Sequence, residues 1–401
     1  MMESTAYASP LTSTRWSSVL LLVSAGTVAA VQVGKAVIAA PVLQADLGIS
    51  LADIGWLTGI FALLGLIGGI PTGALAASFG SRRILLIGLL TTILGAACGA
   101  MATGLPALLL SRIIEGAGFL MITVAAPSLL AQVTEPADRD LAFALWSCFM
   151  PAGIAAAMLA GPLFESWRVL WWASGGLALL VYLLVWLIIP NSGERQAWSW
   201  RSLKANSITV LSARAPVVLA VMFALYGLMF FALFSFLPVL LMERMEVSHR
   251  SAGLLSALAT AANILGNLAA GVLLSRGITR ASLLVGASLT MGLSSLGIFL
   301  SLLPDTGTFM LCVVFSAVGG LIPAALLSAA PLVAPTAALV PVVLGLIIQG
   351  NNLGQIIGPI AVGSAIQAFG WSSAAVLVAA AALVAVAVAL TFGRNSQPAR
   401  P

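Results

Sequence analysis

The chain has 401 residues, of which 61% are hydrophobic and only 7% are charged, with a formal net charge of +5. Soluble domains carry roughly 25% charged residues, so this composition excludes a water-soluble globular protein and indicates a surface solvated mainly by lipid. The basic residues lie between apolar runs and form no patch interleaved with aromatic residues, which excludes a nucleic-acid-binding protein.

The apolar runs are long enough to cross a membrane, since a spanning helix needs about 20 such residues. The first six predicted helices cover 17–42, 52–78, 83–103, 106–132, 141–164 and 169–190. The second six cover 217–242, 252–275, 281–303, 308–333, 339–368 and 372–392. The longest polar interval, 191–216, separates the two sets. The pattern therefore predicts an all-α polytopic membrane protein with twelve spans in two six-helix bundles, 1–190 and 217–401, joined by a cytoplasmic linker.

The distribution of Lys and Arg predicts the orientation of the chain. With the N-terminus inside, the outer loops hold only Arg168, Arg244 and Arg250 of the 17 basic residues, and Lys35 and Arg112 lie within spans. The others lie on the inner side, as the positive-inside rule requires. Both termini are therefore predicted to be cytoplasmic. The first apolar run is too long for a signal-peptide core and no Asn-x-Ser/Thr sequon occurs, which is consistent with a bacterial inner membrane.

An internal repeat links the two predicted bundles. Five pairs share an offset of 197 or 198 residues: Pro41 and Pro238, Gly55 and Gly253, Gly73 and Gly271, Arg83 and Arg280, and Gly161-Pro162 and Gly358-Pro359. Parallel repeats in transporters are related by an axis along the membrane normal, with the solute site between them. A duplicated but inert scaffold is the alternative interpretation.

Short motifs accompany the repeat. They read Gly73-Ala-Leu-Ala-Ala-Ser-Phe-Gly80-Ser-Arg82-Arg83, its counterpart Gly271-Val-Leu-Leu-Ser-Arg276-Gly277-Ile-Thr-Arg280, and Arg112-Ile-Ile-Glu115-Gly116-Ala-Gly118 in the fourth predicted helix. They resemble the signatures of the major facilitator superfamily (MFS) over nearly the whole chain. Pro41-Val-Leu-Gln and Gly48-Ile-Ser, taken with the third motif, are similar to cyanate-permease-like bacterial members.

The resemblance implies a monomeric secondary transporter of a small molecule, with two rocking halves, a proton as the coupling ion, and no enzymatic activity, metal or cofactor. It assigns a conformational role to Gly73, Gly80, Arg82, Arg83, Gly271, Arg276, Gly277 and Arg280, although Arg82 and Arg83 would also serve merely to fix topology. The sequence departs from the family where its signature has an acid, because Ala77 and Ser275 stand there. The motif in the fifth helix, Gly153 and Gly161-Pro162, also contains fewer glycines than the corresponding motif that drug antiporters share.

Three charged residues lie at membrane depth, where each costs on the order of 2.5–3.5 kcal/mol. Lys35 and Arg112 both fall about six residues from the outer ends of their helices, or roughly 9 Å deep. Glu115 follows Arg112 at spacing i, i+3 and shares its helix face. We predict that the three form one polar layer facing the solute path, suited to an anionic substrate. In this interpretation either Glu115 pairs with Arg112 and leaves Lys35 for an anionic substrate, or an anion binds near both cations and leaves Glu115 free to take a proton. The alternatives are that Lys35 extends to the outer surface and that Arg112 and Glu115 form a structural pair.

The second bundle offers neutral polar groups in place of charges. Candidate substrate contacts are Tyr226, Asn351, Asn352 and Gln355. Further neutral polar residues in the predicted spans of this bundle are Asn263, Asn267 and Gln349. Amides within spans also tie helices together, so packing is the alternative role. The leading hypothesis is a carrier of a small, anionic solute. The alternatives are a proton-driven exporter of drugs or metabolites, which would favour a carboxylate in the first helix, and a non-transporting sensor or scaffold.

Overall fold

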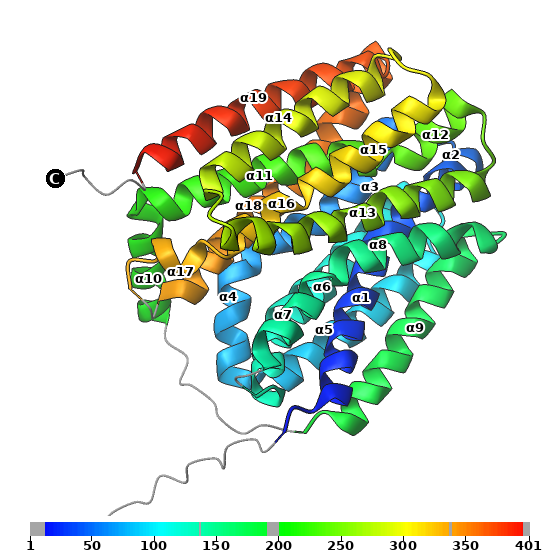
Figure 1. Ribbon diagram of the computed structural model, residues 1–401. Coiled ribbons are helices and arrows are strands. Elements are labelled where there is room, and N and C mark those ends of the chain that lie inside the picture. The colour runs from blue at the N-terminus through cyan, green and yellow to red at the C-terminus, as the bar shows by residue number, and fades with distance from the viewer. Residues whose placement is uncertain (1–12, 136–137, 191–199, 337–338, 396–401) are drawn as a thin grey trace, which may run out of the picture.

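The computed structural model describes residues 13–135, 138–190, 200–336 and 339–395 (Figure 1). Within these ranges the regular structure is entirely helical. The first half contains α1 (Trp16–Ile38), α2 (Ala40–Leu47), α3 (Leu51–Gly59), η1 (Ile60–Ala62), α4 (Leu63–Phe79), α5 (Ser81–Ala100), α6 (Leu105–Val133), α7 (Arg139–Ser147), α8 (Phe149–Ala160), η3 (Gly161–Leu163) and α9 (Trp167–Ile188).

The second half follows the connecting helix α10 (Trp200–Ser212). It contains α11 (Arg214–Phe234), α12 (Leu237–Met245), α13 (His249–Ser275), α14 (Arg280–Phe299), α15 (Asp305–Gly319), α16 (Leu321–Leu327), α17 (Ala330–Val333), α18 (Val340–Phe369) and α19 (Ser372–Asn395). Each of the predicted spans coincides with a helix or a run of helices. The predicted all-α multi-span fold is therefore confirmed.

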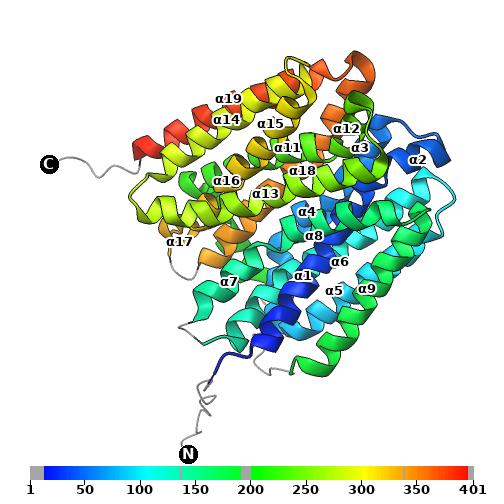
Figure 2. The same ribbon diagram turned by 45° about the vertical axis from the view of Figure 1, so that its right-hand side comes forward.

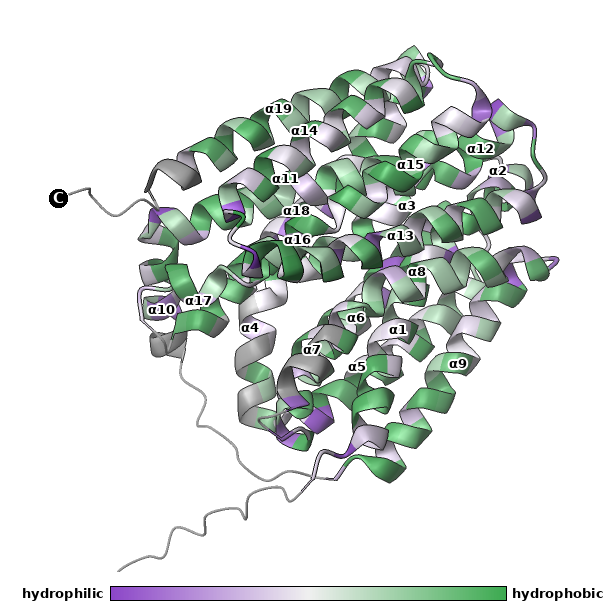
Figure 3. Ribbon diagram, in the orientation of Figure 1, coloured by the Kyte–Doolittle hydropathy of each residue, from purple (hydrophilic) through white to green (hydrophobic). Residues whose placement is uncertain are grey.

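Ten of the described helical segments are long and apolar enough to cross a membrane, and Phe149–Leu163 is a shorter apolar segment. Hydrophobic residues predominate along most of the helices (Figure 3). Many large apolar side chains are exposed along α9 and α19, such as Trp186 at 56% and Leu383 at 65%. An exposed apolar surface of this kind requires lipid as its solvent.

Several predicted spans are interrupted, and proline explains two of the interruptions. The first span ends at Ile38, and Pro41 lies in the first turn of the short helix α2. In the same way α11 ends at Phe234, and Pro238 lies in the first turn of α12. Proline lacks a backbone N–H, so it is tolerated in a first turn and disfavoured in a helix interior. The predicted linker 191–216 also differs, because α10 lies within it and α11 already begins at Arg214.

The two halves lie side by side, with α2 and α12 at one end of the molecule in both ribbon views (Figures 1 and 2). We call this the α2 end. The helices of the two halves diverge toward the opposite end in both views. The orientation predicted from the positive-inside rule, with the α2 end outside, stays a prediction.

Repeated residues of the two halves meet at the α2 end. A Cβ added to Gly55 on α3 would lie 2.3 Å from the carbonyl oxygen of Pro359 on α18, and one added to Gly253 on α13 would lie 2.6 Å from a ring carbon of Pro162. Both are too close for any side chain larger than hydrogen, so glycine permits this approach. The glycines and the prolines are related by the sequence repeat, and each glycine contacts the proline of the opposite half. The two halves are therefore pseudo-symmetric where they touch.

Candidate functional site

Lys35 lies in the last turn of α1 and is fully buried, with 0% of its surface exposed. Its Nζ donates hydrogen bonds to Glu115 Oε1 at 2.6 Å, to Gln32 Oε1 at 2.6 Å and to Ser174 Oγ at 2.9 Å. The same nitrogen lies 4.6 Å from the ring centroid of Trp171. Three acceptors and an aromatic face replace the water that an ammonium group loses on burial. Helices α1, α6 and α9 together build this socket.

Arg112 lies one turn before Glu115 on α6 and is also fully buried. Its Nη1 forms a salt bridge with Glu115 Oε2, and its Nε donates to the carbonyl oxygen of Leu57 at 3.3 Å. The guanidinium carbon lies 4.4 Å from the ring centroid of Phe61. Arg112 Nη2 has no hydrogen-bond partner within the described part of the chain.

The cluster of Lys35, Arg112 and Glu115 carries two positive charges and one negative charge. The two oxygens of the Glu115 carboxylate are divided between the two cations. Charges taken out of water are stable only when they are paired and hydrogen-bonded. The remaining positive charge and the unpaired Nη2 of Arg112 are the features of this cluster that favour an additional anionic group.

Glycines of neighbouring helices determine how closely the cluster is packed. A Cβ on Gly95 of α5 would lie 2.7 Å from Cγ of Glu115, and one on Gly99 would lie 2.3 Å from the indole of Trp171. A Cβ on Gly116 would lie 2.0 Å from the carbonyl oxygen of Phe61. The small residues on α5 and α6 therefore allow the acid and the two aromatic rings to reach their positions.

The structure brings the three predicted charged residues together. The alternative in which Lys35 extends to the surface is wrong, because its ammonium group is buried and bonded to Glu115. Glu115 does pair with Arg112, but it also pairs with Lys35, so Lys35 is not left without a partner. A purely structural role for the Arg112–Glu115 pair stays an alternative prediction. One correction concerns location: the described partners of the cluster come from α1, α3, η1, α6 and α9, so the layer lies inside the first half. A role in solute binding stays a prediction.

Sequence reasoning missed the residues that complete the socket. Gln32 and Ser174 accept hydrogen bonds from Lys35, and Trp171 lies beneath its ammonium group. Gln32 had a detectable signal, because a lone amide three residues before a lysine shares its helix face. Ser174 and Trp171 had none, since α9 approaches α1 only in the folded bundle.

Tyr226 on α11 belongs to a separate buried polar group in the second half. Its hydroxyl oxygen accepts a hydrogen bond from Asn263 Nδ2 at 3.3 Å, and the same amide donates to the carbonyl oxygen of Ser316 at 3.0 Å. The Tyr226 ring stacks between Phe223 and Phe230, with centroid distances of 5.7 Å on each side. This group thus combines a hydroxyl, an amide and an aromatic surface.

The predicted amides of α18 face different neighbours. A Cβ on Gly65 of α4 would lie 2.6 Å from the side chain of Asn352, which places Asn352 against the first half. Asn351 lies against Gly227 of α11 instead. Gln355 is 1% exposed, and its Nε2 has no hydrogen-bond partner among the described residues. Asn352 therefore lies at the contact between the halves, as does Gln349, which lies against Gly69 of α4. Substrate binding by Asn351, Asn352 and Gln355 stays a prediction.

The predicted conformational motif forms two equivalent turns. Gly80, between α4 and α5, has φ 93°, and Gly277, between α13 and α14, has φ 86°. Backbone in this region favours glycine, and the two glycines are 197 residues apart, the offset of the repeat. Arg82 Nη2 donates to the carbonyl oxygen of Trp186 near the end of α9 at 2.6 Å.

The remaining motif residues lie on the same two connections. They are Gly73 in α4, Arg83 in α5, Gly271 in α13, Arg276 at the C-terminal cap of α13, and Arg280 at the start of α14. Arginine beside a helix C-terminus interacts favourably with its carbonyl groups. Arg82 therefore ties α5 to α9, and a role of the motif in conformational change stays a prediction.

Comparison with known proteins identifies the family. The model of the Major Facilitator Superfamily matches residues 20–340. The chain belongs to the Major Facilitator Superfamily. The MFS fold is also evident in solved structures: a bacterial homologue of the human lysosomal transporter Spinster, in an inward-facing and occupied conformation, has a TM-score of 0.75 at 21% identity and covers 95% of this chain and 97% of that chain. The nucleoside transporter NupG has a TM-score of 0.78 at 14% identity, with 95% and 100% of the two chains covered.

Two curated MFS relatives differ in their activities. The 3-(3-hydroxy-phenyl)propionate transporter of Escherichia coli is 30% identical over 259 residues, which cover 61% of this chain and 62% of the relative. The quinolone resistance protein NorA of Staphylococcus aureus is 25% identical over 198 residues, or 48% of this chain and 51% of NorA. The match thus spans less than two thirds of either relative. This MFS protein has the multi-pass helical fold of the family.

Proposed function

We propose that this MFS transporter carries a small organic anion across the bacterial inner membrane, coupled to a proton. The observation that carries the proposal is the buried cluster, in which one carboxylate serves two cations. The unpaired Nη2 of Arg112 offers a donor for an anionic oxygen. An anion that binds here pairs with the positive charge that Glu115 alone does not neutralise.

Glu115 couples the anion to the proton in this mechanism. In the present arrangement the carboxylate is held by Lys35 and Arg112. When the anion takes over one of these cations, Glu115 loses a partner and accepts a proton on its carboxylate. The anion and the proton then move together, so the net charge of the loaded cluster stays at +1. Release of the anion returns Glu115 to its ionised, doubly paired state.

Alternating access opens the cluster to solute in this proposal. It lies toward the α2 end, where the halves touch through Gly55 and Pro359. Contact at this end and divergence at the other support an inward-facing arrangement, with the α2 end outside and both termini in the cytoplasm. The proposed domains are 1–190 and 217–401, with the linker between them at 191–216.

An aromatic carboxylate is the substrate class we favour. One relative transports 3-(3-hydroxy-phenyl)propionate, which carries a carboxylate and a ring. The cations of the first half suit the carboxylate, and the stacked rings of Tyr226, Phe223 and Phe230 in the second half suit an aromatic group. A cyanate-permease-like subgroup would also carry an anion and stays a further prediction.

Proton-driven export of drugs or metabolites is the second candidate. It is favoured by relatives such as NorA and the puromycin resistance protein of Streptomyces alboniger, which is 30% identical over 175 residues. The buried lysine in the first span argues against a cationic drug, because its charge would repel one.

Proteoliposomes test the two candidates directly. We expect uptake of labelled 3-(3-hydroxyphenyl)propionate when the outside is acidic, and loss of at least about tenfold in Lys35→Ala and Glu115→Gln. Arg250→Gln, at an exposed position near the start of α13, is the control and should transport normally. Normal uptake with unchanged pH dependence in both cluster variants would contradict the mechanism. Transport of cationic dyes in place of anions would favour export.

A further inference from the structure

The α2 end carries two matching corners, one in each half. Helices α2 and α12 share Pro-Val-Leu near their starts, 197 residues apart, and the same offset pairs Asp46 with Glu243. Trp167 Nε1 donates to Asp46 Oδ2 at 2.7 Å, and Trp371 Nε1 donates to Glu243 Oε2 at 2.9 Å. In each corner, a carboxylate therefore accepts a hydrogen bond from the indole N–H of a tryptophan at the start of the last helix of its half.

The corner of the first half is filled by its own cation. Arg168, next to Trp167, forms a salt bridge of 2.9 Å from Nη1 to Asp46 Oδ2. Its guanidinium carbon lies 4.1 Å from the ring centroid of Trp167, and Nη2 donates to the carbonyl oxygen of Ala102 at 3.4 Å. A carboxylate, an indole face and a carbonyl group together hold one planar cation.

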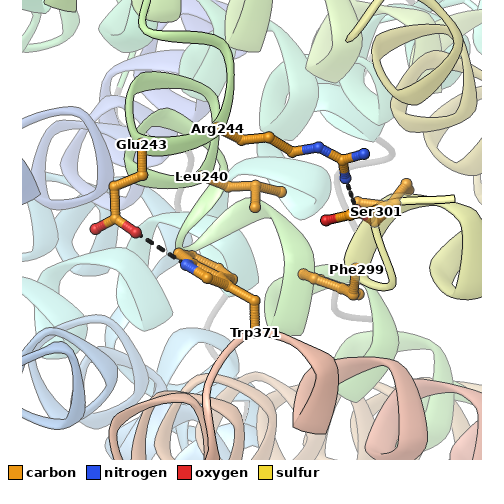
Figure 4. A pocket seen from close by; sticks show the side chains of 7 residues that line it. Leu240, Glu243, Arg244, Phe299, Ser301 and Trp371 are labelled. Carbon is orange, nitrogen blue, oxygen red and sulfur yellow. Dashed lines mark hydrogen bonds between the residues drawn. The ribbon is translucent and has the colours of Figure 1, made fainter. Parts of the chain in front are cut away.

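The corner of the second half lacks this cation. Here the arginine follows the carboxylate in sequence, and Arg244 turns toward the end of α14, where it donates to the carbonyl oxygens of Ile298 and Leu303. Glu243 has no salt bridge within the described part of the chain. In Figure 4, Glu243 points toward Trp371, whereas Arg244 extends to the other side, and Leu240 lies between them.

A cavity of about 250 Å³ occupies the corner of the second half. Its lining includes Leu240, Glu243, Arg244, Phe299, Ser301 and Trp371 (Figure 4). The Trp371 ring is stacked on Phe299 with an interplanar angle of 10°, so its position is held by packing. The cavity thus presents a carboxylate and a fixed aromatic ring, the two groups that hold the guanidinium of Arg168 in the first half.

We propose that this cavity binds an alkylammonium group, which takes the place that Arg168 occupies in the other half. The ammonium pairs with Glu243 and lies on Trp371, while Arg244 lies on the opposite wall and faces an attached phosphate. An aminophospholipid headgroup, phosphatidylethanolamine, and a free amine share this chemistry. The cavity lies where α14 ends and α19 begins, at the level where spanning helices leave the hydrocarbon core, so lipid is the source we expect.

Thermal unfolding of the purified transporter tests the site. Methylammonium chloride is compared with sodium chloride at equal ionic strength, and phosphatidylethanolamine with phosphatidylglycerol in mixed micelles. A ligand that binds the folded state raises Tm. Glu243→Gln removes the charge but keeps an acceptor for Trp371, so it should fold and show an apparent affinity about tenfold weaker. Asp46→Asn removes the matching carboxylate of the first half and should keep the wild-type response.

The outcomes separate the two sources. A Tm increase with phosphatidylethanolamine alone identifies the lipid, and an increase with methylammonium alone identifies a soluble amine; both support the site if Glu243→Gln removes them. Equal responses of wild type and Glu243→Gln overturn the proposal, as does the absence of any response to either amine. Loss of the response in Asp46→Asn as large as in Glu243→Gln also overturns it, because the effect would then not belong to this cavity.

Discussion

The Glu115 carboxylate on α6 accepts a 2.6 Å hydrogen bond from Lys35 Nζ on α1, across 80 positions of sequence. The contact makes the acid common to both buried cations, since its other oxygen pairs with Arg112. Removal of one member therefore changes the charge balance for the other two. Removal of the acid and removal of the lysine should therefore affect the stability of the protein differently.

Glu115→Gln should destabilise the protein more than Lys35→Met. Without the acid, two buried cations face each other with no negative charge, and such a loss costs roughly 3–5 kcal/mol. Lys35→Met leaves the neutral pair of Arg112 and Glu115 and replaces the lysine by an apolar side chain of similar length. Thermal unfolding of both variants measures the difference. An equal or larger loss for Lys35→Met would show that the charge count does not govern the stability of the cluster.

Gly55→Leu should separate the two halves at the α2 end. Its Cβ would lie 2.3 Å from the carbonyl oxygen of Pro359, a backbone atom that cannot move aside alone. The distance between spin labels on α2 and α12, measured by double electron–electron resonance, should therefore shift to longer values. Gly176→Leu is the matched control, because a Cβ there meets nothing within 4 Å. A distance distribution identical in the two variants would argue against close backbone packing at this end.

The stability contribution of Asp46 should depend on pH. Hydrogen bonds from Trp167 and then from Arg168 hold the pKa of this carboxyl below its ordinary value of 3.8. Because the folded pKa is depressed, the stabilisation is present above 3.8 and is lost as the pH falls through the folded value. The Tm difference between wild type and Asp46→Asn should be constant near neutral pH and shrink below pH 3.8. A difference that persists unchanged in acid would assign the effect to geometry and not to charge.

Gly80→Ala should weaken the turn between α4 and α5. With φ at 93°, a Cβ is strained even though a Cβ there meets no atom within 4 Å. The expected cost is on the order of 1–2 kcal/mol, measurable as a lower Tm. Gly271→Ala, which also meets nothing within 4 Å and lies inside α13, should be neutral or slightly stabilising. Equal effects of the two substitutions would mean that φ at Gly80 is not the limiting factor.

Local patterns in the sequence were sufficient to predict the spans and the approach of the three charged residues of the cluster. Hydropathy identified each helical run, and the i, i+3 spacing of Arg112 and Glu115 with the equal depth of Lys35 predicted their approach. These features depend either on residues within a few positions of each other in the sequence or on the thickness of the bilayer. The repeat also aligned the two motifs, and in the folded chain each contains a turn at a glycine with positive φ, Gly80 and Gly277.

Only the tertiary structure determined which groups from distant helices complete each site. Ser174 and Trp171 reach Lys35 because glycines on α5 let α9 pack closely, and no pattern within α9 announces that contact. The two corners at the α2 end show the same division: the repeat pairs Asp46 with Glu243, but the folded chain turns Arg168 toward its carboxylate and Arg244 away. Composition and periodicity specify where a helix lies relative to lipid, whereas the partner of a buried charge depends on side-chain packing among several helices at once.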